Sequence, residues 1–234
     1  MKLKLITLIF CYLLGQFCVA QTQSLQNDVS LDDKYREDQF YISVTYNLLR
    51  NKPIDFTQNG FSTGFSFGFI RDMPINDRRN LAVGLGLGLS ANSYNQNLVI
   101  DESGSAYTYN LISDFEGDVS KNKFYTYVLE LPLEFRWRTS TAEIYNFWRI
   151  YTGFKVGYVF YDQSKLRSDL KNLKISNNSD FNSWQYGVIL SAGYNTWNFH
   201  FFYRLNKLFN DNAKLNVQPI DLSELRIGLI FYIL

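Results

Sequence analysis

The mature part of the sequence lacks cysteine. Both cysteines, Cys11 and Cys18, lie in residues 1–20, where lysines precede an apolar stretch that ends at the small residue Ala20. These are the features of an export signal, so we expect cleavage after Ala20. Lipid attachment is disfavoured, because each cysteine follows a phenylalanine rather than a small residue. A mature chain without a thiol has no disulfide, no thiolate metal site and no cysteine nucleophile.

Two further features are missing from the rest of the chain. No run of ~18 apolar residues follows the signal, so no membrane-spanning helix is expected. A large excess of positive or of negative charge is also missing. The chain has 23 lysines and arginines and 22 acidic residues, so no overall positive potential attracts nucleic acid. Aromatic residues are plentiful instead, at 18% of the chain, yet the mean hydropathy is only -0.19. Polar residues therefore separate the rings, which indicates surfaces that are half apolar and half polar.

The stretch LAVGLGLGLS (81–90) alternates aliphatic residues with glycine and other small residues. Successive side chains of a strand point to opposite faces, so this segment has one aliphatic face and one nearly empty face. Gly84, Gly86 and Gly88 also resemble a phosphate-binding turn. Such a turn needs a helix after it, and the polar stretch that follows has no amphipathic pattern. The segment is therefore predicted to be a strand.

Seven other segments show the same period of two. In one of them Leu129, Leu131 and Leu133 alternate with Glu130 and Glu134. Together with 81–90, these segments predict eight strands. The other seven are 39–50, 60–70, 124–138, 144–161, 181–194, 197–205 and 221–234.

The connections between these strands alternate in length. The long ones are 51–59, 91–123, 162–180 and 206–220, and the short ones are 72–79, 139–143 and 195–196. Long outer loops and short periplasmic turns are typical of an up-and-down barrel in an outer membrane. A soluble sandwich or lipocalin also alternates, but its apolar face points inward and its outer face is polar. In this sequence, phenylalanine and leucine line one face of the strands, and charged residues and glycine line the other. This pattern favours the membrane barrel.

We therefore predict an all-β protein: an eight-stranded antiparallel up-and-down transmembrane β-barrel of the bacterial outer membrane. The barrel domain is expected to cover 39–234. A signal peptide at 1–20 and a polar periplasmic tail at 21–38 are expected to precede it.

The tryptophans lie near the predicted strand ends. Trp137, Trp148 and Trp197 adjoin short turns, and Trp184 adjoins a long loop. Aromatic residues gather at the interfaces of membrane barrels, whereas a soluble core would hold tryptophan at mid-strand. These four are predicted to form an aromatic girdle.

The inward face of the predicted barrel carries charges of both signs. They are Glu130, Glu134, Arg136, Arg138, Arg149, Lys155, Arg204, Glu224 and Arg226. Eight strands leave an interior just wide enough for side chains, so glycines on the wall make room for bulky charged neighbours. Because an unpaired buried charge is costly, we expect these charges to form ion pairs between neighbouring strands. One possible register of 124–138 with 144–161 pairs Glu134 with Arg149, and the next possible register pairs Glu130 with Lys155. We expect a salt-bridged plug rather than a solute pore.

One pair of residues raises a catalytic alternative. If 195–196 is a two-residue turn, Ser191 faces His200 on the inner wall. Some eight-stranded outer-membrane barrels hydrolyse lipid A with serine and histidine, but at the outer-leaflet face. This pair would lie near a periplasmic turn, where nothing orients a nucleophile and base. We expect an ordinary hydrogen bond, no catalytic residue, no cofactor and no small-molecule substrate.

The long connection 91–123 is acidic and contains the motif DFEGD. Its spacing does not match the regular calcium-binding loop. A solvated acidic loop without a metal site is the better interpretation.

The segments YVLELPLEFRWRTS (127–140) and WRIYTGFKVGYVF (148–160) resemble the PorT family of small outer-membrane barrels, and more specifically the PorT-type proteins of the type IX secretion system. The shared pattern is an acid, Leu-Pro, a second acid and a basic-aromatic end, then a short turn and a strand with Gly-Phe-Lys. The resemblance implies a non-enzymatic barrel that takes part in exporting proteases and gliding adhesins. It implies no catalytic residues.

The expected partners are outer-membrane lipid or lipopolysaccharide and other secretion proteins, with no nucleic acid. Two alternatives to the secretion role stay open: a structural or adhesive barrel, and a lipid A-modifying enzyme. The acidic tail, with Asp28, Asp32, Asp33, Glu37 and Asp38, is a candidate docking element for a basic periplasmic partner.

Overall fold

The computed structural model describes residues 38–104, 106–139 and 147–233. All of these residues belong to one compact unit. The expected signal peptide and all of the expected tail except Asp38 lie outside the described residues, as does most of the short turn 139–143. In the described part, no helix is long and apolar enough to cross a membrane.

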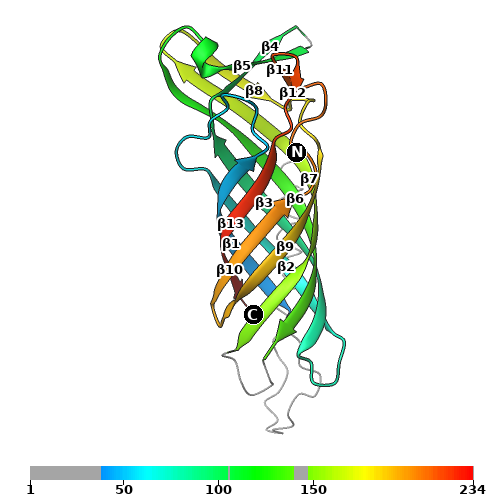
Figure 1. The fold of residues 1–234 in the computed structure, drawn as a ribbon. Coiled ribbons are helices and arrows are strands. Elements are labelled where there is room, and N and C mark those ends of the chain that lie inside the picture. Colours follow the sequence, from blue (N-terminus) through cyan, green and yellow to red (C-terminus); the bar gives the residue numbers. More distant parts are fainter. Residues whose placement is uncertain (1–37, 105, 140–146, 234) are drawn as a thin grey trace, which may run out of the picture. The chain divides into compact units, whose positions relative to one another are not determined.

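Eight long strands close into an antiparallel barrel (Figure 1). They are β1 (Gln39–Arg50), β2 (Thr63–Pro74), β3 (Leu81–Asn95), β6 (Val119–Arg138), β7 (Trp148–Ser168), β9 (Trp184–Tyr194), β10 (Trp197–Arg204) and β13 (Ser223–Ile233). Each strand pairs with the next one along the chain, and β13 pairs with β1 to complete the ring. The predicted eight-stranded up-and-down barrel is confirmed.

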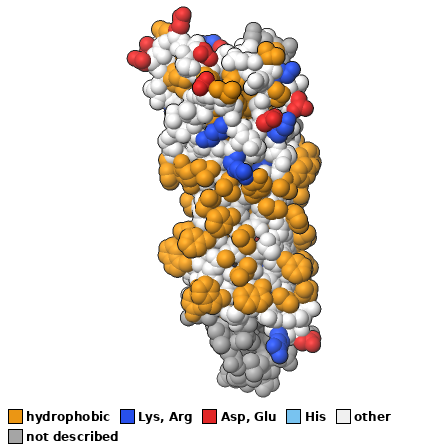
Figure 2. Space-filling model, viewed as in Figure 1, with side chains coloured by type: hydrophobic (Ala, Val, Ile, Leu, Met, Phe, Trp, Pro, Cys, Tyr) orange, Lys and Arg blue, Asp and Glu red, His pale blue; other side chains and the backbone are white. Residues whose placement is uncertain are grey.

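The apolar faces of these strands point outward. Leu85 and Leu87 are 52% and 55% exposed, whereas the glycines that alternate with them are buried. The resulting band of hydrophobic side chains is visible on the face shown in Figure 2, with charged side chains gathered above it. A soluble barrel has the opposite arrangement, so the outer wall is suited to hydrocarbon.

The glycines of β3 are required by what lies opposite them in the interior. A Cβ at Gly84 would lie 2.7 Å from Nε of Arg136, and one at Gly86 would lie 2.6 Å from Cγ1 of Ile70. A Cβ at Gly88 would collide with the hydroxyl of Tyr41. Glycine therefore makes room for one arginine, as expected, and also for apolar and aromatic groups.

At the end of the barrel where the connections are long, those connections fold into a cap. The cap contains β4 (Leu98–Ser103), β5 (Ala106–Leu111), the 3-10 helix η2 (Ile112–Asp114), β8 (Asn172–Ser176), β11 (Lys214–Leu215) and β12 (Gln218–Pro219). Its small strands gather at one end of the barrel in Figure 1. A hydrophobic cluster fills its base, and Phe124, Phe181 and Phe209 pack ring against ring within it.

The prediction of a solvated loop at 91–123 was therefore wrong for most of its length. β3 continues to Asn95, β6 begins at Val119, and β4 pairs with β5 as a hairpin between them. Leu98, Ile100 and Leu111 are buried in the cap core. Each strand is only six residues long, so the alternation of Tyr107, Tyr109 and Leu111 is too brief to stand out in the sequence. The acidic side chains of the motif 114–118 do remain exposed.

Candidate functional site: the charged interior of the barrel

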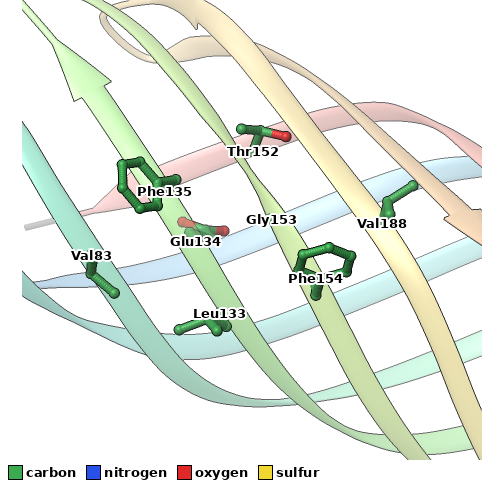
Figure 3. Close-up of a pocket in the computed structure, with 8 residues that line it drawn as sticks. All are labelled: Val83, Leu133, Glu134, Phe135, Thr152, Gly153, Phe154 and Val188. Atoms are coloured by element: carbon green, nitrogen blue, oxygen red, sulfur yellow. The ribbon is translucent and has the colours of Figure 1, made fainter.

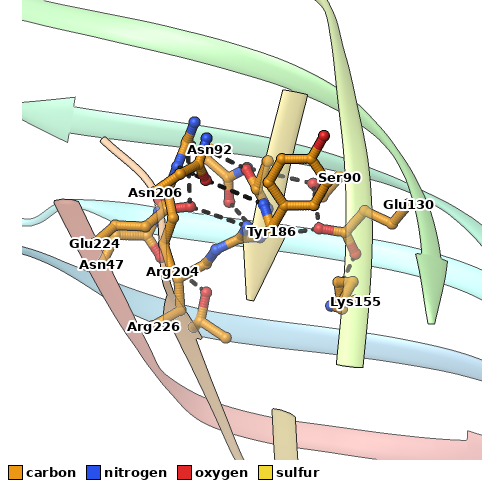
Figure 4. Close-up of polar contacts among 12 residues, drawn as sticks. Asn47, Ser90, Asn92, Glu130, Lys155, Tyr186, Arg204, Asn206, Glu224 and Arg226 are labelled. Carbon is orange, nitrogen blue, oxygen red and sulfur yellow. Dashed lines mark hydrogen bonds and ion pairs between the residues drawn. The ribbon is translucent and has the colours of Figure 1, made fainter. Parts of the chain in front are cut away.

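The upper ion-pair cluster lies nearer the cap, and Glu130 is the acceptor that its cations share. Figure 4 draws the contacts of this cluster. The Glu130 carboxylate accepts hydrogen bonds from Nζ of Lys155 at 2.9 Å, Nη1 of Arg226 at 3.0 Å and Oγ of Ser90 at 2.9 Å. Glu130 is fully buried. Two cations and a hydroxyl thus replace the water that a carboxylate loses on burial.

Glu224 holds the other side of the same cluster. It accepts a hydrogen bond from Nη2 of Arg226 at 3.1 Å and another from the hydroxyl of Tyr94. Nη1 of Arg204 lies 3.9 Å from the same carboxylate. Arg226 also donates to Asn92 at 3.3 Å, so this arginine joins two carboxylates and an amide.

A second cluster lies toward the end with the short turns, and Asp72 is its centre. Arg138 donates to both carboxylate oxygens of Asp72, at 2.9 and 2.8 Å, and Arg136 donates to it at 3.0 Å. Arg136 also donates to Glu134 at 2.9 Å. A two-pronged contact between arginine and carboxylate is among the strongest hydrogen-bonded pairs in proteins.

Sequence reasoning missed Asp72, because the second strand was expected to end at 70. In the structure β2 continues to Pro74, and Asp72 follows Ser66, Gly68 and Ile70 on the inner face. Extending the alternation by one step would have placed this carboxylate inside.

The register between β6 and β7 differs from both expected pairings. Glu134 lies opposite Gly153, Glu130 opposite Gly157, and Arg138 opposite Arg149. The expected contact of Glu134 with Arg149 is therefore wrong, whereas Lys155 reaches Glu130 diagonally. The physical reason is space, because each glutamate faces a glycine and leaves the centre of the barrel free for cations from other strands.

Arg149 is the one predicted interior charge that joins neither cluster. It is 5% exposed, and its Nε and Nη1 have no hydrogen-bond partner in the part of the chain that is described. Its guanidinium instead stacks on Phe147 at 4.5 Å and lies 5.3 Å from the ring centre of Tyr232. Contact with aromatic faces partly replaces the missing counterion.

The ion pairs bridge opposite walls of the barrel. β6 and β13 are four strands apart in either direction around the ring, yet Glu130 of β6 binds Arg226 of β13. Nearer the short turns, Tyr151 of β7 contacts Tyr232 of β13, with ring centres 5.4 Å apart. Side chains therefore span the interior at two levels.

The four tryptophans lie near the ends of the outer wall. Trp137, Trp148 and Trp197 lie at the end with the short turns, and Trp184 lies at the cap end. All four are exposed, and three contact aromatic neighbours in tilted or edge-to-face geometry. The ring pairs are Trp148 with Tyr194, Trp184 with Tyr158, and Trp197 with Phe231, at 5.3, 5.2 and 5.5 Å.

Ser191 and His200 form a buried hydrogen bond. The turn 195–196 brings Ser191 opposite His200, as the sequence predicted, and Oγ lies 2.8 Å from Nδ1. Both residues are nearly inaccessible, at 1% and 3% exposure. A substrate in the membrane or in water would have to pass through the packed wall to reach them.

A polar cluster supports the cap where it joins the barrel. The hydroxyl of Tyr109 donates to Asp180 at 2.8 Å and accepts from Nδ2 of Asn178 at 3.1 Å, while the backbone amide of Asn178 donates to Asp162 at 3.0 Å. Asp162 lies beyond the apolar band, and burial raises the pKa of its carboxyl to about 6. Burial also raises the pKa of the Tyr109 hydroxyl above its usual range.

We also considered the carboxylates and the histidine as metal ligands. Among residues 38–104, 106–139 and 147–233, no group of three or more histidine, cysteine, aspartate or glutamate side chains is placed to hold a metal ion.

A groove of ≈ 590 Å³ lies on the outer wall (Figure 3). Phe135 and Phe154 border it, and Thr152 and Gly153 leave the gap between them. Thr152 satisfies its hydroxyl by donating to the backbone oxygen of Ile189 at 3.1 Å. The groove belongs to the apolar band. Glu134 also lines it, but its carboxylate binds Arg136 in the interior.

A closed ring of eight strands with hydrocarbon-suited walls and a charged interior defines an outer-membrane β-barrel. The family model described as "Outer membrane protein beta-barrel domain" matches residues 19–210. The chain belongs to this family.

Two solved structures share part of this arrangement. Both are of Ail, the attachment invasion locus protein of Yersinia pestis, and one of them is in complex with the heparin analogue sucrose octasulfate. Each is 15% identical to this chain and covers 84% of it and 98% of its own length, with TM-scores of 0.36 and 0.34. A likeness at this level carries no functional argument. The search of curated proteins found no match.

Proposed function

We propose that this outer-membrane barrel is a non-enzymatic, non-conducting component of type IX protein secretion. The pattern of acid, Leu-Pro and acid in 127–140, which resembles the PorT family, supports the secretion role. One observation carries the non-conducting role: Glu130 and Arg226 join opposite walls of the barrel. A cargo protein has no path through such an interior.

Any secretion role then belongs to the surfaces at the two ends. We place the cap outside the cell and the short turns in the periplasm, together with the acidic tail 21–38, because long loops of such barrels face outward. The tail would attract a basic partner at modest ionic strength.

The test is complementation of a deletion strain, with a secreted protease as the reporter. The wild-type gene should restore secretion. A variant without 22–36 should insert into the membrane but leave the protease in the periplasm, because no strand has been altered. Normal secretion by the deletion strain itself would exclude the secretion role.

A structural or adhesive role is the second candidate, and the folded cap favours it. Phe181 and Phe209 hold the cap as a fixed surface, which suits recognition of something outside the cell. In that case the deletion strain would secrete normally but lose attachment to surfaces.

The lipid A-modifying enzyme is the third candidate, and the enclosed position of Ser191 and His200 argues against it. Ser191→Ala should leave the mass spectrum of lipid A unchanged. A change in lipid A acylation that depends on Ser191 would revive the enzymatic interpretation.

A further inference from the structure

Five cations form a two-row ladder on the outer surface of the barrel, just beyond the apolar band. Lys123 of β6 lies opposite Lys165 of β7, which lies opposite Lys174 of β8. In the next row Lys121 lies opposite Arg167. We call these five residues the basic ladder.

The basic ladder has no counterions of its own. Within the described residues, none of its five members forms an ion pair, although nearby Lys171 pairs with Asp101 at 2.7 Å. Lys123 lies over the ring of Tyr125, at 4.4 Å from its centre. Like charges directly opposite each other on neighbouring strands destabilise a sheet. Local stability therefore does not explain why cations occupy all three positions of one row.

A β-bulge directs the ladder outward. The pairing of β6 with β7 shifts between Tyr127 and Val128, so the alternation of β7 reverses above Phe160. Tyr161, Gln163, Lys165 and Arg167 consequently share the outer face, while Asp162 and Leu166 point inward. Without the shift, these cations would point into the cap.

The height of the ladder matches the headgroup region of a membrane. Lys123 lies four residue steps from Tyr127, which is at the upper edge of the apolar band. Four steps span about 13 Å along a strand. A tilt of roughly 40° reduces this to about 10 Å along the membrane normal. The polar layer of one leaflet is roughly 5–8 Å thick, and a lysine side chain easily reaches down into it.

Polar groups fill the step between the band and the ladder. Gln163 donates to the hydroxyl of Tyr161 at 2.7 Å, and that hydroxyl lies 3.1 Å from Oγ of Ser176. A shallow depression beside the ladder is lined by Ser120, Lys165, Arg167 and Lys174, among others. Cations and hydroxyls around a depression suit an anion with several oxygens.

We propose that the basic ladder binds the phosphate groups of a phosphorylated glycolipid in the outer leaflet. The ladder borders the band that lies in hydrocarbon, so a ligand whose acyl chains lie on that wall would bring its phosphates to Lys123, Lys165 and Lys174. A soluble polyanion would gain nothing from the neighbouring apolar surface. The membrane lipid is therefore the ligand that uses both features.

The test compares two double variants of the full mature protein that lose the same charge. Lys165→Gln with Lys174→Gln removes two members of the ladder, and Lys52→Gln with Lys214→Gln removes two exposed lysines elsewhere at the cap end. Binding of doubly phosphorylated lipid A is measured by native mass spectrometry after release from mixed micelles. A gel shift on heating verifies that each variant is folded.

The ladder variant should bind doubly phosphorylated lipid A roughly 10-fold more weakly or worse, whereas the control should match wild type. Lipid A stripped of phosphate should bind both variants equally. Lys165→Arg with Lys174→Arg keeps the charge and should retain binding.

Equal lipid A binding by the ladder and control variants would overturn the proposal. So would selective loss of binding to a soluble sulfated polysaccharide while lipid A binding stays intact, because the ladder would then recognise a polyanion from outside the membrane.

Discussion

At the scale of single residues, the interior depends on a few carboxylates that serve more than one cation. Asp72 accepts hydrogen bonds from Arg136 and Arg138, and Glu130 accepts from Lys155 and Arg226. The barrel interior buries six cations and four carboxylates. The cations are Arg136, Arg138, Arg149, Lys155, Arg204 and Arg226, and the carboxylates are Asp72, Glu130, Glu134 and Glu224. Losing one carboxylate should therefore lower the free energy of unfolding more than losing one cation.

Asp72→Asn should destabilise the barrel severely. It leaves Arg136 and Arg138 buried with one carboxylate fewer, and breaking a buried ion pair costs about 3–5 kcal/mol. Urea titration of the folded fraction in lipid vesicles measures the change. The double variant Asp72→Asn with Arg138→Gln removes a matched pair and should be milder. If it is the more harmful of the two, the two side chains are not coupled as described.

Substitutions on the two faces of β3 should fail for different reasons. Leu85→Arg places a charge against hydrocarbon and should cost about 2–4 kcal/mol near the middle of the membrane. Gly86→Leu should instead crowd Ile70 and the backbone of Phe69. Urea titration in lipid vesicles and again in detergent micelles distinguishes the two variants. Only the arginine variant should regain stability in micelles, because detergent packs less tightly around the outer wall. If the arginine variant folded normally in a bilayer, the inner and outer faces of β3 would have been assigned the wrong way round.

Asp162 should make the cap sensitive to pH. Burial raises the pKa of its carboxyl from 3.8 to about 6, so the folded state favours the protonated form. That contribution to stability is fully present below about pH 4 and is lost as the pH rises through about 6. The protection factor of the Asn178 amide in hydrogen exchange, which is taken relative to the intrinsic exchange rate at each pH, should therefore fall between these pH values. In Asp162→Asn the dependence should disappear, and a dependence that persists would come from another group.

At the scale of elements, the sequence was sufficient where the alternation was unbroken and insufficient where it changed. The outward Leu85 and Leu87 and the inward Glu130 follow from period two alone. The fifth strand was expected to end at 161, because the alternation of apolar residues stops there. In the structure, β7 continues and the bulge reverses the alternation. The cap was missed for a different reason: Leu98, Ile175 and Phe209 come from three separate connections, and the closed barrel brings them together.

The tip of the β4–β5 hairpin offers the cleanest test of orientation. Gly104 has a φ of 67° with nothing within 4 Å of a Cβ, so an epitope tag inserted there should leave the cap intact. Antibody should bind this tag on intact cells. A tag at Arg79, in the turn between β2 and β3, should be detected only after the outer membrane is opened. The opposite labelling pattern would show that the cap faces the periplasm, contrary to the orientation proposed above.

At the scale of the whole barrel, closure of β1 against β13 should give resistance to detergent. Eleven paired positions join these strands, from Phe40 with Ile233 to Arg50 with Ser223. The unboiled protein should migrate faster on a denaturing gel than the boiled protein. Removing Ser223–Ile233 should abolish this difference, whereas removing 22–36 should preserve it. Identical mobility before and after boiling of the intact chain would contradict a closed sheet.

The pairing of Glu130 with Arg226 also ties assembly to completeness of synthesis. β13 is the last of the eight barrel strands along the chain, and it supplies both Glu224 and Arg226 to the upper cluster. Until it arrives, Glu130 lacks one of its two cations, and hydration of the half-built interior compensates for the loss. A chain without β13 therefore keeps an open, hydrated seam between β1 and β10. The ion pairs across the interior thus make closure of the ring depend on its final strand as well as on the backbone hydrogen bonds of the sheet.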